Sequence, residues 1–239
     1  MSLDINDDAI FIADSHIQKN RDALIHKLNY LHTTRQKNPS QIILLGDISN
    51  LLVGGIESSH KINKGLIECL KHLPSQIIYF EGNHDFNIGC ILDSIITIPR
   101  VSQPIIARYK DKTVLLAHGD IFLNKKYEWY IKTITSKAII SLLGYVDSIT
   151  RGKIFDIIND KIKAKAIRYP KDIESIVNSR IQSYKRYIKS LDKRIDMVIE
   201  GHFHLGRILH TKDFTYIAMP SFYHEAKIFD IQEERFEIL

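Results

Sequence analysis

The chain has 239 residues, of which 44% are hydrophobic and 26% are charged, with 33 lysines and arginines against 28 acidic residues. This composition is ordinary for a soluble globular protein with a substantial core, and it excludes disordered and collagen-like chains. The two cysteines, Cys69 and Cys90, are too few for a disulfide scaffold, and no apolar run reaches the roughly 18 residues of a membrane-spanning helix. Because the first residues, MSLDINDD, are acidic, we expect a cytoplasmic protein without a signal peptide.

Short apolar runs alternate with helix-length connections along the first third of the chain. The runs cover 9–14, 41–47 and 77–83, and the connections between them cover 17–38 and 56–73. Each run is bounded by glycine or an acidic residue, as strands buried on both faces tend to be. The order predicts a βαβαβ unit with a largely parallel sheet.

Further strands are predicted after this unit. PIIARYKDKTVLLAHGD predicts a hairpin that turns at residues 110–112, and DMVIEGHFH at 196–204 predicts another buried strand. Beyond residue 204 apolar and polar residues alternate, so we expect antiparallel strands that complete a second sheet. The predicted fold class is α/β, a sandwich of two mixed sheets flanked by helices.

The segment between the last two predicted buried strands is strongly basic. Residues 124–195 hold 17 basic and 7 acidic residues, whereas the remainder holds 16 basic and 21 acidic ones. A basic segment on an acidic body favours an anionic partner, such as a phosphorylated metabolite or an anionic membrane surface. A solvated helical face explains the charge equally well. No aromatic-and-basic nucleic-acid module is recognisable, so no nucleic acid is expected.

The same segment carries helical patterns. Apolar residues recur at intervals of three and four from Tyr127 to Ile149, which predicts one helix with an apolar stripe. Its middle is apolar on a second side as well, at Ile139, Ile140, Leu143 and Val146. This helix is expected to lie between the body and either another helix or an acyl chain, although simple packing on the sheet edge remains an alternative. A second helix, predicted near 172–191, has four basic residues suited to phosphates: Arg180, Lys185, Arg186 and Lys189.

Five of the apolar runs end in residues that bind metals or phosphate. These ends read Asp14-Ser15-His16, Gly46-Asp47, Gly82-Asn83-His84-Asp85, His118-Gly119-Asp120 and Gly201-His202-Phe203-His204. Ligands of open α/β sheets bind at the carboxyl ends of strands, so these ends are expected to converge on one rim. Both side chains of Asp-x-His and of His-x-His would share one face of an extended strand end.

The types of these side chains predict the metal chemistry. Carboxylate, imidazole and carboxamide groups without a thiolate suit Mn²⁺, Fe²⁺ or Zn²⁺. The metal-binding side chains are even in number, and one aspartate among them stands alone, which predicts two metal ions bridged by a shared carboxylate. This arrangement is used in phosphoryl transfer.

The motifs D-x-H, GD, GNHD, HGD and GHxH, in this order over residues 9–204, resemble the calcineurin-like metallophosphoesterase superfamily. The resemblance implies a metal-dependent phosphoesterase with a metallophosphoesterase-type β-sandwich, a single domain over 1–239 with a helical cap insertion at about 121–195. It implies one divalent ion, most commonly Mn²⁺, on Asp14, His16, Asp47 and His204. It implies a second ion on Asp47, Asn83, His118 and His202. His84 would protonate the leaving oxygen, and Asp85 would orient its ring.

The length of the insertion and Tyr127 soon after HGD are similar to the UDP-2,3-diacylglucosamine pyrophosphatases of lipid A biosynthesis. This likeness implies an acylated sugar nucleotide as substrate, contact with the inner membrane surface, and substrate binding by Asn83, Tyr127 and Arg207. The chain departs from that group, which usually has arginine at the position of His84 and a carboxylate near Asn50. A phosphomonoesterase or nucleotide phosphodiesterase with a soluble substrate, and a non-catalytic binding scaffold, therefore remain alternatives.

Overall fold

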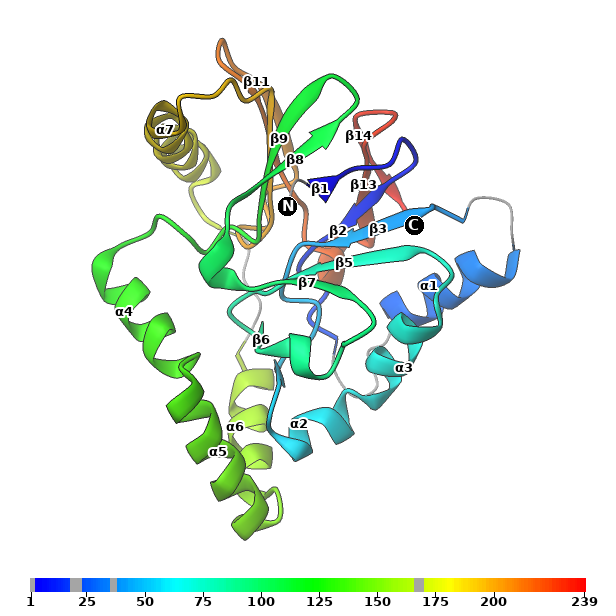
Figure 1. The fold of residues 1–239 in the computed structure, drawn as a ribbon, viewed down its shortest axis with the longest axis vertical. Coiled ribbons are helices and arrows are strands. Elements are labelled where there is room, and N and C mark those ends of the chain that lie inside the picture. The colour runs from blue at the N-terminus through cyan, green and yellow to red at the C-terminus, as the bar shows by residue number, and fades with distance from the viewer. Residues whose placement is uncertain (1–2, 18–22, 35–37, 166–169) are drawn as a thin grey trace.

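The computed structural model describes residues 3–17, 23–34, 38–165 and 170–239, and two six-stranded sheets packed face to face form its centre (Figure 1). The first sheet has the order β1 (Leu3–Asp4), β8 (Ile105–Tyr109), β9 (Lys112–Ala117), β10 (Met197–Glu200), β12 (Thr215–Ala218) and β11 (Arg207–His210). The second has the order β14 (Arg235–Ile238), β13 (Lys227–Asp230), β2 (Ile10–Ile12), β3 (Gln41–Leu44), β5 (Gln76–Phe80) and β7 (Ile96–Ile98).

The remaining elements surround these sheets. A small parallel pair consists of β4 (Leu52–Val53) and β6 (Asp85–Phe86), and two short 3₁₀ turns are η1 (Ile88–Cys90) and η2 (Arg100–Ser102). The helices are α1 (Ala23–Thr34), α2 (Glu57–Ile62), α3 (Lys64–His72), α4 (Lys125–Ile134), α5 (Lys137–Thr150), α6 (Lys153–Lys163), α7 (Ile173–Leu191) and α8 (Phe222–Glu225). No helix in the described ranges is both long and apolar enough to cross a bilayer.

The central strands are apolar throughout because both of their faces are covered. In β3, Ile43 packs into the core between the two sheets, whereas Ile42 and Leu44 pack against the residues of α1 and α3. A third apolar cluster lies under α7 on the outer face of the first sheet. The predicted class, a sandwich of two mixed sheets flanked by helices, is confirmed, as are the parallel βαβαβ unit and the hairpin of β8 and β9.

The prediction that antiparallel strands after residue 204 complete a second sheet holds for β11 and β12 but not for β13 and β14. Strands β11 and β12 extend the first sheet, but β13 pairs antiparallel with β2 of the second, with Phe229 opposite Phe11. Helix α8 explains the crossing, because the Phe222 amide donates to the Ala13 carbonyl at 3.1 Å and so brings the chain beside β2.

The single helix predicted from Tyr127 to Ile149 is also wrong, since two helices occupy this range. Helix α4 ends at Ile134, and Ser136 begins the next one, where its side chain accepts a hydrogen bond from the Ile139 amide. A serine at this position is a favourable helix cap, which explains the break.

Helices α4, α5 and α6 form a layer below the sheets in Figure 1, here called the cap. It packs on the region of β4 and β6 through Val53, Phe86, Ile140 and Phe155. At one point the contact is between backbones, because a Cβ built at Gly144 of α5 would lie 2.6 Å from the carbonyl oxygen of Gly55. Residues 121–195 therefore divide between two places, the cap and the helix α7 on the first sheet.

Candidate metal centre

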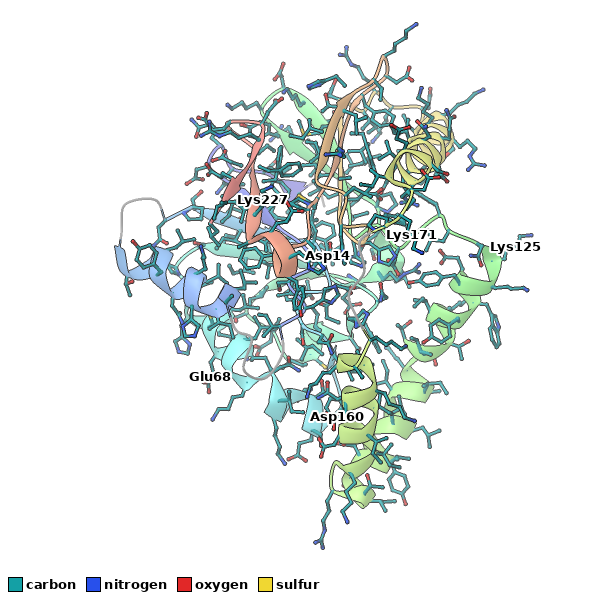
Figure 2. The ribbon with its side chains drawn as sticks, turned by 180° about the vertical axis from the view of Figure 1, so that it is seen from behind. Asp14, Glu68, Lys125, Asp160, Lys171 and Lys227 are labelled. Carbon is teal, nitrogen blue, oxygen red and sulfur yellow. The ribbon has the colours of Figure 1, made fainter. Side chains whose placement is uncertain are left out.

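Metal-competent side chains from both sheets meet at the centre of the molecule. The seven predicted ligands follow β2, β3, β5, β9 and β10, in the order Asp14, His16, Asp47, Asn83, His118, His202 and His204. Figure 2, which shows the molecule from behind, places Asp14 near the middle, whereas Lys125 and Asp160 of the cap lie toward the periphery. Strand ends from two different sheets thus face one region.

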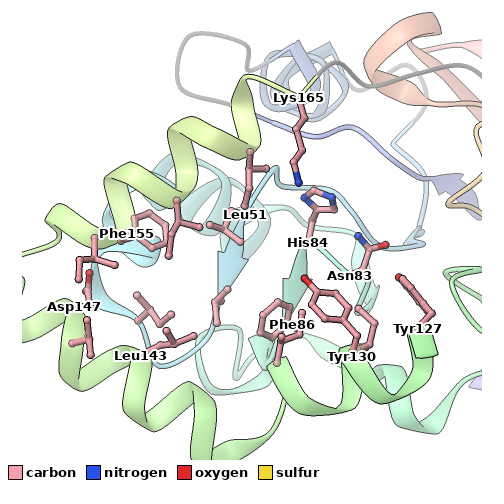
Figure 3. A pocket seen from close by; sticks show the side chains of 18 residues that line it. Leu51, Asn83, His84, Phe86, Tyr127, Tyr130, Leu143, Asp147, Phe155 and Lys165 are labelled. Carbon is pink, nitrogen blue, oxygen red and sulfur yellow. The ribbon is translucent and has the colours of Figure 1, made fainter. Parts of the chain in front are cut away.

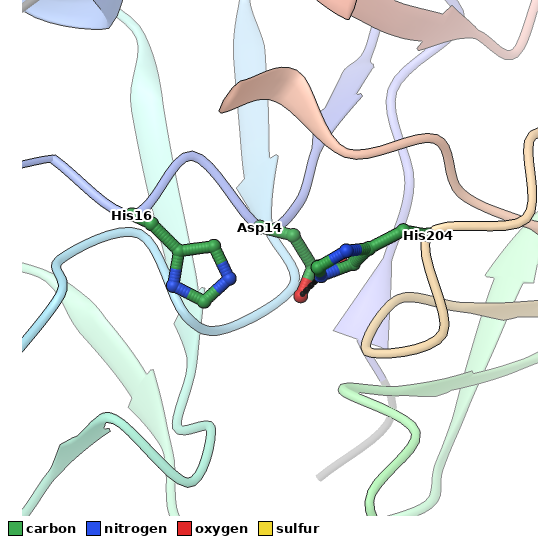
Figure 4. A group of neighbouring side chains, drawn as sticks. All are labelled: Asp14, His16 and His204. Atoms are coloured by element: carbon green, nitrogen blue, oxygen red, sulfur yellow. Dashed lines mark ion pairs between the residues drawn. The ribbon is translucent and has the colours of Figure 1, made fainter. Parts of the chain in front are cut away.

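The side chains form two groups of three, in each of which one potential ligand atom per residue lies within 4.8 Å of the others. The first group is Asp14, His16 and His204 (Figure 4). The second is Asp47, His118 and His202, and the Asn83 carboxamide oxygen lies 3.4 Å from His118 Nε2. A further trio, His16, Asp47 and His84, overlaps both. The structure therefore brings all the predicted ligands together with His84.

The donor atoms of these groups fit divalent cations. His16 Nδ1 is buried and has no hydrogen-bond partner among the described residues, and the buried Asp14 Oδ1 has only an ion-pair contact, with His204 Nε2 at 3.3 Å. Burial lowers the pKa of His16 to about 4, and burial together with His118 lowers the pKa of His202 to about 4, so both rings are neutral at neutral pH, as a metal ligand must be. Burial would raise the pKa of Asp47, but nearby imidazoles, His118 first, hold it below its ordinary value.

His118 is oriented by its backbone surroundings. Its Nδ1 lies 2.7 Å from the Leu45 carbonyl oxygen, to which it donates, and this leaves Nε2 directed at Asp47 Oδ1, 3.6 Å away. Such outer hydrogen bonds fix the tautomer of a metal-binding histidine. Burial opposes protonation of the ring, but Asp47, Asp120 and Asp14 raise the pKa of His118 to about 9. A cation beside these carboxylates would take the place of that proton.

The backbone conformation of the ligand loops differs from the prediction. Five ligands have positive φ angles, namely Asp14 at 53°, His16 at 43°, Asp47 at 52°, His202 at 67° and His204 at 55°. Side chains with a Cβ adopt this left-handed region rarely, and such strain is typical of functional sites. These residues are therefore not in extended strand ends, as predicted, but in tight loops. The loops direct Asp14 and His16 to one group and send His202 and His204 to different groups.

Asp85 does not orient His84, which corrects the predicted role. The Asp85 carboxylate accepts the amides of Asp47 at 2.9 Å, Ile48 at 2.7 Å and Gly82 at 2.8 Å, and the hydroxyl of Tyr79 at 2.6 Å. It is fully buried and fastens the Asp47 loop to the loop that carries Asn83.

His84 is oriented instead by the backbone of Asn50, whose carbonyl oxygen lies 2.7 Å from His84 Nδ1. Sequence reasoning missed this contact because a carbonyl group carries no residue-specific signal. It also missed His224 of α8, whose ring lies 6.4 Å from that of His204, because chemistry was sought only at the ends of buried strands.

Tyr127 links the metal region to the cap. Its hydroxyl donates to Asp120 at 3.2 Å, and burial together with Asp120 raises the pKa of Tyr127. Arg100 also bonds Asp120, at 2.5 Å, and reaches both carboxylate oxygens of Glu128 on α4, each at 3.1 Å. Since Asp120 follows His118 by two residues, the position of α4 is tied to the loop of the second group.

An apolar cavity of about 370 Å³ runs from Asn83 and His84 into the cap. Figure 3 shows His84, Asn83 and Tyr127 near one end and Asp147 at the other, with Phe86, Leu143 and Phe155 on the walls between them. Lys165 extends toward His84 at the same end as the metal-competent groups. The cavity is large enough for part of an extended aliphatic chain.

The structure places two arginines for which the sequence predicted contacts with the substrate or with phosphates. Arg207 begins β11 with an exposed side chain and does not belong to the lining of this cavity. The prediction that Arg180 serves phosphates is wrong, because its guanidinium is buried and paired with Glu200.

A family model described as calcineurin-like phosphoesterase matches residues 9–206 of the chain. A UDP-2,3-diacylglucosamine hydrolase from Histophilus somni (strain 2336) is 22% identical over 234 residues, which cover 96% of this chain and 98% of that protein. A UDP-2,3-diacylglucosamine hydrolase from Vibrio parahaemolyticus is 22% identical over 248 residues, with 96% of each chain covered.

Solved structures matched by the chain include an archaeal phosphodiesterase, with 16% identity, 96% of both chains covered and a TM-score of 0.44. A dimetal phosphatase from Danio rerio has 12% identity and a TM-score of 0.45, with 95% of this chain and 93% of that chain covered.

Proposed function

This chain belongs to the calcineurin-like phosphoesterase family and is a metal-dependent phosphoesterase, and we propose that it cleaves the pyrophosphate of UDP-2,3-diacylglucosamine. Water would add to one phosphorus and the bridging oxygen would leave, which gives UMP and 2,3-diacylglucosamine 1-phosphate. The observation that carries this proposal is the apolar cavity that opens beside His84. Relatives at 22% identity carry the name of this activity, which supports the same substrate.

The two ligand groups support a centre for two ions. Asp14, His16, Asp47 and His204 would hold one ion. Asp47, Asn83, His118 and His202 would hold the other, with Asp47 shared between them. Nitrogen and oxygen donors without sulfur suit Mn²⁺. When bound, two such ions stabilise the attacking and leaving oxygens of a phosphoryl transfer.

His84 is proposed as the proton donor to the leaving oxygen. Because its Nδ1 is held by the Asn50 carbonyl, Nε2 is left to carry the proton in the imidazolium form. The ring lines the end of the cavity next to Asn83, where a phosphate attached to an acylated sugar would lie. Tyr127 and Lys165 line the same end and would contact the substrate there, whereas nothing in the cavity lining supports Arg207 in this role.

The acyl chains would occupy the cavity within the cap. Its walls are mainly aliphatic and aromatic side chains, and each methylene moved out of water contributes roughly 0.8 kcal/mol. Filling the cavity should therefore weaken the binding of a diacylated substrate while the metal region keeps its activity on small ones. Leu143 lines the cavity, whereas its neighbour Leu142 is 56% exposed on the outer side of α5, which offers a matched pair.

The test compares Leu143→Trp with Leu142→Trp on the diacylated UDP-sugar, on UDP-N-acetylglucosamine and on an activated aryl phosphodiester. Exclusion of three methylenes by the Leu143 variant would raise KM for the diacylated substrate by roughly 50-fold. Neither variant should change the rate on the aryl phosphodiester. If the wild-type chain cleaves the unacylated sugar nucleotide or a phosphomonoester as well as the diacylated one, it acts on a soluble substrate instead. No Mn²⁺-dependent cleavage of any of them would indicate a binding scaffold.

The outer face of the cap supports contact with an anionic membrane surface. Trp129, Tyr145 and Ile149 are 72%, 66% and 63% exposed, although the sequence pattern placed the last two in an apolar stripe. Exposed cations lie on the cap helices, at Lys125, Lys126 and Lys132 of α4, Lys137 of α5 and Lys153 of α6. Aromatic and aliphatic side chains among lysines are typical of helices that lie on anionic lipid.

Vesicle sedimentation tests this contact. Replacement of Trp129, Tyr145 and Ile149 by serine should reduce binding to vesicles that contain anionic lipid, whereas Val101→Ser, at a position that is 84% exposed but outside the cap, should not. Equal binding by both variants would contradict the proposed membrane face.

A further inference from the structure

A buried ion pair joins α7 to the end of β10, beneath the ligand loops. Glu200 is fully buried and Arg180 is 2% exposed. Arg180 Nε donates to Glu200 Oε1 at 2.9 Å, and Nη2 donates to Oε2 at 2.6 Å. Glu200 is the last residue of β10, two positions before His202. The pair therefore lies directly below the loop that carries two predicted metal ligands.

The same guanidinium reaches the loop of His118. Arg180 Nη1 donates to the carbonyl oxygen of Ile121 at 2.6 Å, three residues after His118. The guanidinium carbon also lies 5.0 Å from the centre of the Phe203 ring, and Phe203 stands between His202 and His204. One side chain outside the ligand groups thus contacts both chain segments that the first sheet contributes to the site.

The arrangement around Glu200 is fully satisfied. Tyr184 donates to Oε2 at 2.7 Å and Tyr216 donates to Oε1 at 2.5 Å, so the carboxylate accepts four hydrogen bonds. Buried ion pairs contribute little net stability, because desolvation of the charges offsets their attraction, and apolar residues of similar volume are often as stable. Stability alone is therefore a weak reason for an arginine and a glutamate at these positions.

We propose that Arg180 is a positioning residue of the metal centre, which holds the 118–121 and 200–204 segments at a fixed separation. The inference rests on the proposed two-metal function. His118 and His202, whose ring centres lie 5.1 Å apart, are both on these segments and both belong to the second ligand group. The first group takes only His204 from them, since Asp14 and His16 follow β2 of the other sheet. Loss of Arg180 therefore weakens the second ion more than the first.

The variant Arg180→Met with Glu200→Gln removes both charges together, so that neither is left buried without its partner. Equilibrium dialysis of the full-length chain against Mn²⁺ alone measures the two binding constants, with no substrate present. The second Mn²⁺ is expected to bind about 10- to 100-fold more weakly, the usual effect of losing a group that orients a metal ligand. The first Mn²⁺ is expected to lose less than that.

Two control variants on the same helix separate positioning from general destabilisation. Val177→Ala removes buried apolar volume from the cluster that contains Tyr184, but it removes no hydrogen bond to either loop. Arg186→Met removes an exposed cation two residues beyond Tyr184. Both should bind two Mn²⁺ ions with the affinity of the wild type. Arg180→Lys serves if the double variant does not fold: it keeps a charge near Glu200, but a single ammonium group cannot reproduce the three directed contacts.

The proposal is overturned if folded Arg180→Met/Glu200→Gln, or folded Arg180→Lys, binds both ions as the wild type does. It is overturned as well if Val177→Ala weakens the second ion to the same extent. A wild-type chain that binds fewer than two ions would instead refute the two-metal function, on which this role depends.

Discussion

Replacement of Gly82 by alanine tests how closely the Asp47 loop is packed. A Cβ at Gly82 would lie 2.3 Å from Asp47 Oδ1, roughly 1 Å closer than the 3.4 Å at which ordinary contacts begin. Asp47 cannot give way easily, since the Asp85 carboxylate holds its amide at 2.9 Å and the His84 amide holds its Oδ1 at 2.9 Å. Gly82 has no positive φ, so the alanine backbone itself is unstrained and the clash is the whole effect.

A displacement of about 1 Å in a catalytic group can cost about 100-fold in rate, and Asp47 is proposed to serve both ions. We expect Gly82→Ala to lower kcat/KM for an activated aryl phosphodiester by at least this factor, and to lower the number of Mn²⁺ ions bound. Gly65→Ala is the control, because a Cβ at this position of α3 has Ile25 Cδ1, at 3.9 Å, as its nearest neighbour. It should leave the rate unchanged, and because Gly65 lies in the first turn of α3 it should stabilise the chain by at most about 0.5–1 kcal/mol. Two bound ions and a rate within threefold of wild type in Gly82→Ala would refute the packing argument.

Three further predictions concern other parts of the chain. His84→Ala should keep the metal content and lower turnover by about 10²- to 10⁴-fold for a poor leaving group but less for an activated aryl phosphate, and equal losses on the two would remove His84 from the acid role. Arg100→Met leaves the buried Asp120 with the Tyr127 hydroxyl but without its charged partner. It should lower the free energy of unfolding by about 3–5 kcal/mol, or the Tm measured in chelator by roughly 6–20 °C, and Asp120→Asn in the same chain should restore part of this loss. Burial raises the pKa of Cys69 to about 11, so iodoacetamide at pH 8 should label the exposed Cys90 alone, as mass spectrometry of the peptides would show.

The sequence predicts the fold well where burial dictates the residue pattern. Strand β3 is recognisable because Ile42, Ile43 and Leu44 all face apolar neighbours, so the run is continuous. The choice of sheet for β13 is not recognisable in this way, because either sheet would bury Phe229. What decides it is the contact between α8 and the Ala13 carbonyl, and a backbone contact leaves no trace in residue type.

The same distinction holds for the candidate site, whose residue types are predictable from the sequence but whose geometry is not. Its side chains could be identified because carboxylates and imidazoles seldom end an apolar run without a function. Their geometry could not, since no residue pattern in the sequence indicates the positive φ angles of Asp14 and Asp47. The role predicted for Asp85 is wrong for a related reason. A carboxylate next to His84 in the sequence indicates a shared role, but the hydrogen-bond partners of Asp85 include the backbone amides of Asp47 and Ile48 in another loop.

The cap contacts the body at several points, which include the backbone contact of Gly144 with Gly55, the ion pair of Glu128 with Arg100 and the apolar packing of Ile140 and Phe155 on Val53 and Phe86. Because the cap is held by contacts of these different kinds, we expect the cavity to be open before a ligand binds. If the helices stay in place when an acyl chain enters, entry requires only side chains to turn, which takes nanoseconds, whereas movement of whole helices takes microseconds or longer. A protein built this way would meet its ligand at a rate set by encounter, with no slow isomerisation preceding the chemical step.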